Sequence, residues 1–313
     1  MSFTTDTKLE LSKIIPDKKC CQLAEIAGFL RFAGSITFTG IGKLGIRVYI
    51  DSPAVARLFI TLVKEYFGAK TALSIGEPKA ISKEKTYVLN ITSDMNAEQI
   101  LREVGMLGVK EGSNYFDAWI AGEVIKKRCD KKAALRGIFL ANGSISDPAK
   151  SYHLEITCDE EYRAKEVSRL INSFGLKSKI VLRKNRFVVY IKEGEQISDF
   201  LNIIGANGQY FQYQNIMIMK DMKNKANRIS NCEAANLDKS VNAAQKQIAD
   251  INLIKEVRGL ETLPDRLYET ALKRLEFPDL GLSELAKEFE PELTKSGLNH
   301  RFTKLSEIAA KMR

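Results

Sequence analysis

Basic and amide side chains gather in one stretch without acidic residues near the C-terminus, residues 294–305. Asparagine can make two hydrogen bonds to adenine, and lysine reaches guanine or a phosphate. We therefore predict that this stretch contacts double-stranded DNA. The candidate contacts are Lys295, Ser296, Asn299, His300, Arg301 and Lys304.

Two predicted helices position these side chains. The first covers residues 282–289, and residues 290–292 interrupt it. Thr294 is a typical N-cap for the second helix, whose apolar face would be formed by Leu298, Phe302, Leu305 and Ile308. Two helices joined by a tight turn form a helix-turn-helix, in which the start of the second helix reaches base edges. The alternative is a helical hairpin that only contributes to packing.

The residues before this hairpin are predicted to be mostly helical. Residues 206–230 form a lysine-rich connector, which is predicted to be a helix end or a linker. The apolar spacing over residues 232–256 predicts one long helix. Leu263-Pro264 interrupts the chain, and a further helix is expected over residues 265–275.

A pattern of small and apolar residues occurs twice, in residues 28–36 (GFLRFAGSI) and residues 137–145 (GIFLANGSI). Small residues allow two helices to approach closely, so we expect a helix pair with Ala33 and Asn142 side by side at its end. Two carboxylates at such positions would bind a divalent metal and activate water. Alanine offers no ligand and asparagine one neutral oxygen. We therefore expect no catalytic residue, no metal and no cofactor there, and no enzymatic activity.

The repeat extends beyond these two segments. Each is followed by a predicted strand, a helix, two further strands and a helix. The first of these helices should begin at Pro53 in one copy and be capped by Asp159 in the other, and they should end at Gly68 and Gly175. Internal repeats constrain the fold strongly. The expected class is α+β, with the order αββαββα twice, followed by an all-α helix-turn-helix domain.

Basic side chains alternate with apolar ones on the predicted strands. Over residues 186–192 this alternation predicts a sheet with one apolar face and one basic, partly aromatic face. The auxiliary DNA contacts predicted on basic faces are Arg47, Tyr49, Lys177, Lys179, Arg183, Arg186, Tyr190 and Lys192. The alternative is an ordinary solvated face, which Glu155 favours because it lies on the counterpart of the strand that carries Arg47.

The distribution of charge points to a polyanionic partner. The chain has 313 residues and a net charge of +9, whereas residues 227–313 hold equal numbers of basic and acidic residues. The whole excess therefore lies in residues 1–226. A basic surface attracts nucleic acid and accelerates encounter with it.

Composition also limits the class of protein. The five cysteines are scattered without a Cys-x-x-Cys or Cys/His pattern, which predicts reduced thiols and no structural zinc. The first residues do not resemble a signal peptide, and the chain has no apolar run of about 18 residues that could span a membrane. We expect a cytoplasmic, nucleoid-associated protein without a membrane partner.

The duplicated segments resemble the paired signature helices of LAGLIDADG homing endonucleases, in which an acidic residue precedes the terminal glycine. Combined with the helix-turn-helix, the chain resembles the WhiA family of bacterial regulators over nearly its whole length. The distinctive runs are residues 227–236 (NRISNCEAAN), 263–267 (LPDRL) and 295–301 (KSGLNHR). The resemblance implies a transcription factor linked to cell division, chromosome segregation or sporulation. It also implies that the helix-turn-helix is the main promoter reader and that the LAGLIDADG part assists it or contacts other proteins.

We expect three domains: a first LAGLIDADG-like repeat over residues 1–112, a second over 113–220, and a helical linker with the helix-turn-helix over 221–313. Three functions compete. The first is a sequence-specific transcription regulator, the second a non-catalytic interaction hub that docks transcription or division proteins. The third is a homing endonuclease or RNA maturase, against whose nuclease form Ala33 and Asn142 count.

Overall fold

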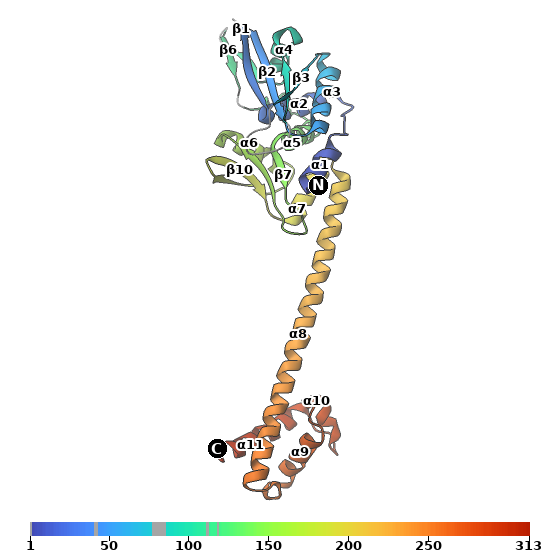
Figure 1. Cartoon of the computed structure of the whole chain (residues 1–313), viewed down its shortest axis with the longest axis vertical. Helices are drawn as coiled ribbons and strands as arrows, with labels where there is room; N and C mark the ends of the chain where they lie inside the picture. The colour runs from blue at the N-terminus through green and yellow to red at the C-terminus, as the bar shows by residue number, and fades with distance from the viewer. Residues whose placement is uncertain (1, 41–42, 77–85, 111–112, 118) are drawn as a thin grey trace. The chain divides into compact units, whose positions relative to one another are not determined.

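The computed structural model describes residues 2–40, 43–76, 86–110, 113–117 and 119–313. The chain divides into two compact units, residues 1–220 and residues 221–313. Figure 1 shows the order of the elements. A hydrophobic core lies within each unit, and each unit is described by itself.

Unit 1 begins with α1 (Phe3–Leu11) and contains the repeat twice. The first copy consists of α2 (Lys19–Ala33), β1 (Gly34–Gly40), β2 (Lys43–Ile50), α3 (Pro53–Phe67), β3 (Ala72–Gly76), β4 (Thr86–Ile91), a 3-10 turn η1 (Ser93–Met95) and α4 (Ala97–Glu103). A hairpin follows, formed by β5 (Leu107–Lys110) and β6 (Ser113–Phe116). The second copy consists of α5 (Arg128–Asn142), β7 (Gly143–Ile145), β8 (Leu154–Cys158), α6 (Glu161–Asn172), β9 (Lys179–Arg183), β10 (Arg186–Ile191) and α7 (Gly194–Ile204).

The two copies build the same sheet. The strand order is β1-β2-β4-β3 in one and β7-β8-β10-β9 in the other, and neighbouring strands are antiparallel. The predicted order αββαββα, twice, is therefore confirmed. Proline at the first position of α3 and Gly68 after its end, at φ 65°, are the start and stop signals that the sequence predicts there.

The central helices α2 and α5 pack against each other without space for a methyl group at two glycines. A Cβ atom on Gly28 would lie 2.3 Å from the Ala134 carbonyl oxygen, and one on Gly137 would lie 2.2 Å from that of Glu25. This contact confirms the close helix pair that the small residues predict.

An ion pair that the sequence analysis did not predict crosses this interface. The Arg136 guanidinium donates to both carboxylate oxygens of Glu25, at 3.0 and 2.5 Å, and the Glu25 side chain is 1% exposed. Burial raises the pKa of the Glu25 carboxyl, and the hydrogen bonds from Arg136 oppose that rise. Because each partner alone would be an uncompensated buried charge, a shift of the two helices that separates the pair would be destabilising.

Unit 2 holds the end of α8 (Asn207–Val257), the 3-10 turn η2 (Leu260–Thr262), α9 (Asp265–Glu276), α10 (Leu282–Leu285), the 3-10 turn η3 (Ala286–Glu288) and α11 (Lys295–Ala310). The Arg274 side chain, 1% exposed, donates from Nη1 to the carbonyl oxygens of Phe277, Pro278 and Leu280. These bonds hold the loop that leads from α9 to α10.

Several predicted boundaries were wrong. The lysine-rich connector is helical from Asn207 onward, because α8 runs without interruption from Asn207 to Val257. Asp159 is not the cap of α6, since Glu160 takes that position and the helix ends at Asn172. The first predicted helix of the helix-turn-helix is a single α turn, α10, continued by η3.

Candidate nucleic-acid interface

The polar stretch of residues 294–305 lies at the start of α11. The Thr294 hydroxyl accepts a hydrogen bond from the Gly297 amide at 3.1 Å, which confirms the predicted N-cap. Leu298, Phe302 and Leu305 are buried in the core of unit 2. The cap therefore sets where the helix begins, and the apolar residues set which face it buries.

The opposite face of α11 is exposed. Lys295, Ser296, Asn299, His300 and Lys304 are all exposed. Their spacing along the helix brings Ser296, Asn299 and His300 onto adjacent turns. Thr303, which the sequence analysis omitted, is also exposed, and its hydroxyl donates to the Asn299 carbonyl. Uncharged donors and acceptors thus alternate with positive charge over the first three turns, and Glu307 follows on the next turn.

Arg301 has a different environment from its neighbours. Its guanidinium lies 3.3 Å from the Thr270 hydroxyl and 3.5 Å from a Glu269 carboxylate oxygen, and it stacks over the Phe289 ring. These partners belong to α9 and to the turn before α11. Of the six predicted contacts, Arg301 is therefore the one that joins α11 to the rest of its unit.

Lys295 borders a hollow of about 550 Å³ inside unit 2. Its other walls come from α8, α9 and α10, and include Asn236, Lys239, Ser240 and Arg274. Lys239 and Ser240 are exposed polar residues that the sequence analysis did not select. The signal for them was weak, because this part of α8 has no alternation of buried and exposed positions.

The second sheet of unit 1 has the predicted basic face. Arg183 lies opposite Arg186 and Lys179 lies opposite Tyr190 in the β9–β10 ladder, so that all four side chains share one face. The Lys192 ammonium lies 5.3 Å from the Tyr190 ring centre. Lys177 is outside the strand, because β9 begins at Lys179.

The β9–β10 turn adds a cation that the sequence analysis missed. Lys184 and Asn185 adopt left-handed φ values of 47° and 61°, as a two-residue hairpin turn requires. Lys184 is exposed between Arg183 and Arg186, so three of the four residues 183–186 at this turn are basic. The sequence did hold a signal for this turn, since the segment RKNR (residues 183–186) lies between two runs in which apolar and polar residues alternate.

Acidic residues reduce the charge of this face. Glu155 lies opposite Tyr190 in the β8–β10 ladder and lies 3.3 Å from the Ser144 hydroxyl and 3.1 Å from His153 Nε2. Arg186 has an exposed ion pair with Asp159 at 3.6 Å. The face is therefore basic at β9 and at the β9–β10 turn, whereas towards β8 it carries both acidic and basic side chains.

The first sheet has a more neutral face. Arg47 Nε donates to the Asn90 amide oxygen at 3.1 Å, and Ser35 lies opposite Arg47 in the β1–β2 ladder. Tyr49 lies two residues further along β2 and is 46% exposed. Arg47 and Tyr49 thus share a face as predicted, with polar uncharged neighbours.

Ala33 and Asn142, the two positions that lack a carboxylate, lie at the ends of the helix pair. Ala33 is the last residue of α2 and Asn142 the last of α5. The Asn142 amide donates to the Thr157 carbonyl oxygen at 2.6 Å, which ties it to β8. Near the end of α2, Arg163 donates to the Arg31 carbonyl, and Arg31 donates to the carbonyls of Gly105 and Asp117. Two guanidinium groups therefore make hydrogen bonds around the last turn of α2.

Three of the five cysteines come together in space. Cys20 and Cys21 in the first turn of α2 lie beside Cys129 and Asp130 in the first turn of α5, with their ligand atoms within 4.8 Å of one another. Sequence spacing could not reveal this cluster, since 109 positions separate Cys21 from Asp130.

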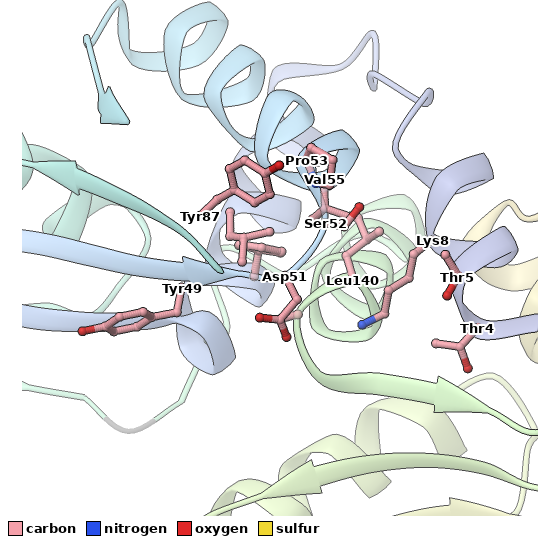
Figure 2. Close-up of a pocket in the computed structure, with 13 residues that line it drawn as sticks. Thr4, Thr5, Lys8, Tyr49, Asp51, Ser52, Pro53, Val55, Tyr87 and Leu140 are labelled. Carbon is pink, nitrogen blue, oxygen red and sulfur yellow. The ribbon is translucent and has the colours of Figure 1, made fainter. Parts of the chain in front are cut away.

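A cavity of about 520 Å³ lies between α1 and the junction of β2 with α3 (Figure 2). Lys8 of α1 and Asp51, which follows β2, both extend into this cavity. These two described side chains form no ion pair with each other. Burial lowers the pKa of the Lys8 ammonium to about 8, and the negative charge of Asp51 opposes this shift.

None of the helices among the described residues combines the length and the apolar character needed to cross a membrane.

Comparison with known proteins covers almost the whole chain. Residues 19–107 match the WhiA N-terminal LAGLIDADG-like domain, residues 131–223 the WhiA LAGLIDADG-like domain, and residues 226–309 the WhiA C-terminal HTH domain. The "Probable cell division protein WhiA" of Thermoanaerobacter sp. (strain X514) is 43% identical over 100% of this chain and 98% of its own length. The protein of the same name from Clostridium novyi (strain NT) is 41% identical over 100% of this chain and 99% of its own length.

A solved structure also matches. The crystal structure of full-length DUF199/WhiA from Thermatoga maritima is similar with a TM-score of 0.62 and 25% identity, over 99% of each chain. The expected α+β class, a duplicated LAGLIDADG-like unit followed by a helix-turn-helix, is confirmed. The chain belongs to the WhiA family.

Proposed function

We propose that this chain is a sequence-specific DNA-binding transcription regulator linked to cell division. In this proposal the helix-turn-helix reads duplex DNA, and the LAGLIDADG-like unit has no catalytic role. The match to the WhiA C-terminal HTH domain supports the first part, and the names of the relatives support the link to division. Association with the nucleoid in the cytoplasm, and a role in sporulation where the host sporulates, follow from the same proposal.

One observation carries the proposal: the exposed face of the first three turns of α11. Its apolar residues are buried, its N-terminus is capped by Thr294, and its solvent side offers Lys295, Ser296, Asn299 and His300. The beginning of the second helix of a helix-turn-helix is the part that enters the major groove. Asn299 supplies the amide that suits adenine, and Lys295 supplies a cation for guanine or phosphate.

We infer that the basic face of the second sheet is an auxiliary DNA surface. Lys179 and Arg183 are exposed, carry no ion pair among the described residues, and lie on the same face as Arg186 and Tyr190. Such residues contact phosphates without reading sequence. The second candidate is that this face docks a transcription or division protein, which Glu155 and its hydrogen bonds favour.

In vitro selection tests the proposal. Full-length protein should enrich one sequence motif from a pool of random duplexes, and in the presence of Mg²⁺ it should bind the selected DNA without cutting it. Recovery of an unenriched pool after repeated selection would contradict sequence-specific binding. Occupancy across the genome of the source organism should then show the same motif near genes for division or chromosome segregation.

A further inference from the structure

We propose that Cys20, Cys21, Cys129 and Asp130 form a zinc site that joins the beginnings of α2 and α5. The four ligand atoms come from the first turns of two helices and lie within 4.8 Å of one another. Three thiolates with one carboxylate are a donor set that suits zinc, whereas Mg²⁺ and Ca²⁺ prefer oxygen ligands.

The measured separations fit a tetrahedral ion. Metal–ligand distances of about 2.3 Å for sulfur and about 2.0–2.2 Å for oxygen give tetrahedral edges of about 3.8 Å between sulfurs and about 3.5 Å between sulfur and oxygen. Asp130 Oδ1 lies 3.8 Å from Cys21 Sγ and 3.4 Å from Cys129 Sγ. The whole set therefore needs a contraction of about 1 Å at most to enclose zinc.

The carboxylate is already held in a ligating orientation. Asp130 Oδ2 accepts a hydrogen bond from the Lys127 amide at 3.0 Å, at the N-terminus of α5. This bond leaves Oδ1 directed at the thiols. A hydrogen bond to the second oxygen of a ligating carboxylate is the kind of support that metal sites use to fix their ligands.

Burial and local charge favour the same occupant. Cys21 is 8% exposed and Asp130 is 3% exposed, whereas Cys20 and Cys129 are half-buried, so an ion would be shielded and still accessible. Three thiolates and a carboxylate around Zn²⁺ leave two negative charges. The N-termini of two 15-residue helices offset part of that charge. Lys18 and Lys19, which precede Cys20, and Lys127 and Arg128, which precede Cys129, add positive charge around the cluster.

Such a site would act as a structural clamp on the central helix pair. It lies at the opposite end of α2 and α5 from Ala33 and Asn142. Binding of zinc only to the folded pair would raise the stability of unit 1. The proposal is independent of DNA binding by α11.

Metal titration of the full-length protein tests this inference. Reduced, metal-free protein is titrated with Zn²⁺ in competition with a chromogenic chelator, and bound metal is counted by mass spectrometry after desalting. Wild type should bind about one Zn²⁺ per chain, and Cys129→Ser and Asp130→Asn should each weaken binding by at least about tenfold. Cys232→Ser, at an exposed cysteine outside the cluster, is the matched control and should bind like wild type.

Two further readouts separate ligation from a general loss of structure. Co²⁺ in place of Zn²⁺ should give the visible bands of tetrahedral cobalt and a thiolate charge-transfer band, both lost in Cys129→Ser. Zinc should raise the thermal midpoint of wild type and Cys232→Ser but not of Cys129→Ser. Wild-type protein that binds less than about a tenth of an equivalent, or Cys129→Ser that retains tight binding, would overturn the proposal. A reduced protein that takes no zinc but forms a disulfide within the cluster on oxidation would overturn it in favour of a thiol redox pair.

Discussion

Gly28 and Gly137 are the residues at which one methyl group would collide with the facing backbone. Gly28→Ala gains up to about 1 kcal/mol of helix propensity, but its Cβ would meet the Ala134 carbonyl oxygen at 2.3 Å. Backbone cannot move aside as a side chain can, so overpacking dominates. We expect the free energy of unfolding of unit 1 to fall by about 1–3 kcal/mol, measured by urea denaturation of the full-length protein.

The control is Gly122→Ala, because no heavy atom lies within 4 Å of a Cβ built there. Its unfolding midpoint should stay close to that of wild type. A Gly28→Ala protein as stable as Gly122→Ala would show that the two helices are not in contact at this point.

Lys8 provides a prediction about pH. Burial lowers its pKa to about 8, whereas an ordinary lysine titrates near about 10.4. Its neutral, nucleophilic form therefore increases as the pH rises through 8, about two units before that of exposed lysines. Acylation by a small reagent, followed by peptide mass spectrometry, should give a labelling rate for Lys8 that levels off above about pH 9.

Ordinary exposed lysines should continue to react faster up to about pH 10. Asp51→Asn should lower the pKa of Lys8 further, because it removes the negative charge that opposes the burial effect. An unchanged labelling profile in Asp51→Asn would contradict the electrostatic coupling inside the cavity of Figure 2.

At the scale of elements, α11 is the helix that carries the proposed readout. Asn299→Ala should reduce affinity for the selected DNA by about 1–3 kcal/mol, while affinity for random DNA changes little, because a lost base contact removes only specific binding. Fluorescence anisotropy with both duplexes measures this difference. Lys311→Ala, an exposed residue just after α11, should lower both affinities slightly and equally. An equal loss on both duplexes for Asn299→Ala would mean that Asn299 touches only the DNA backbone.

The ends of α2 and α5 carry a prediction about chemistry. Ala33 and Asn142 supply no carboxylate, and Asn142 donates its amide to Thr157. Full-length protein incubated with a long, varied DNA pool and either Mg²⁺ or Mn²⁺ should generate no new ends by gel or sequencing. Cleavage that requires the metal and disappears on adding a chelator would contradict a non-catalytic role.

Elements whose signal is local were predictable from the sequence. Pro53 at the first position of α3, the caps at Gly68 and Thr294, and the small residues of α2 and α5 were such signals. The full length of α8 was not, because residues 221–243 are exposed on all sides and give no apolar periodicity. The site was predicted at the level of helix and face. Partners that come from distant segments of the chain could not be predicted from local patterns. Examples are Glu269 for Arg301 in unit 2 and Asp130 for Cys21 in unit 1.

At the scale of the whole molecule, the distribution of charge predicts how the proposed DNA contacts are divided between the two units. The net charge of +9 lies in residues 1–226, and residues 227–313 are neutral overall. Because residues 227–313 have no net charge, their attraction to DNA phosphates should be weak. The basic face of β9 and β10 should therefore supply most of the salt dependence of binding. Each lost phosphate contact lowers the slope of log K against log salt by about 0.9. Reversing Lys179 and Arg183 to glutamate should therefore reduce the slope by about two units without changing the selected motif.

The matched control reverses Lys64 and Lys165, two exposed lysines on α3 and α6 outside the strands. It changes the net charge equally, so any long-range effect of total charge appears in both variants. A flatter slope only in the β9 variant would assign phosphate contacts to that strand. Equal slopes in both variants and wild type would remove the sheet from the DNA interface. Docking of a protein partner would then be the better account of the basic face, and α11 would act on DNA alone.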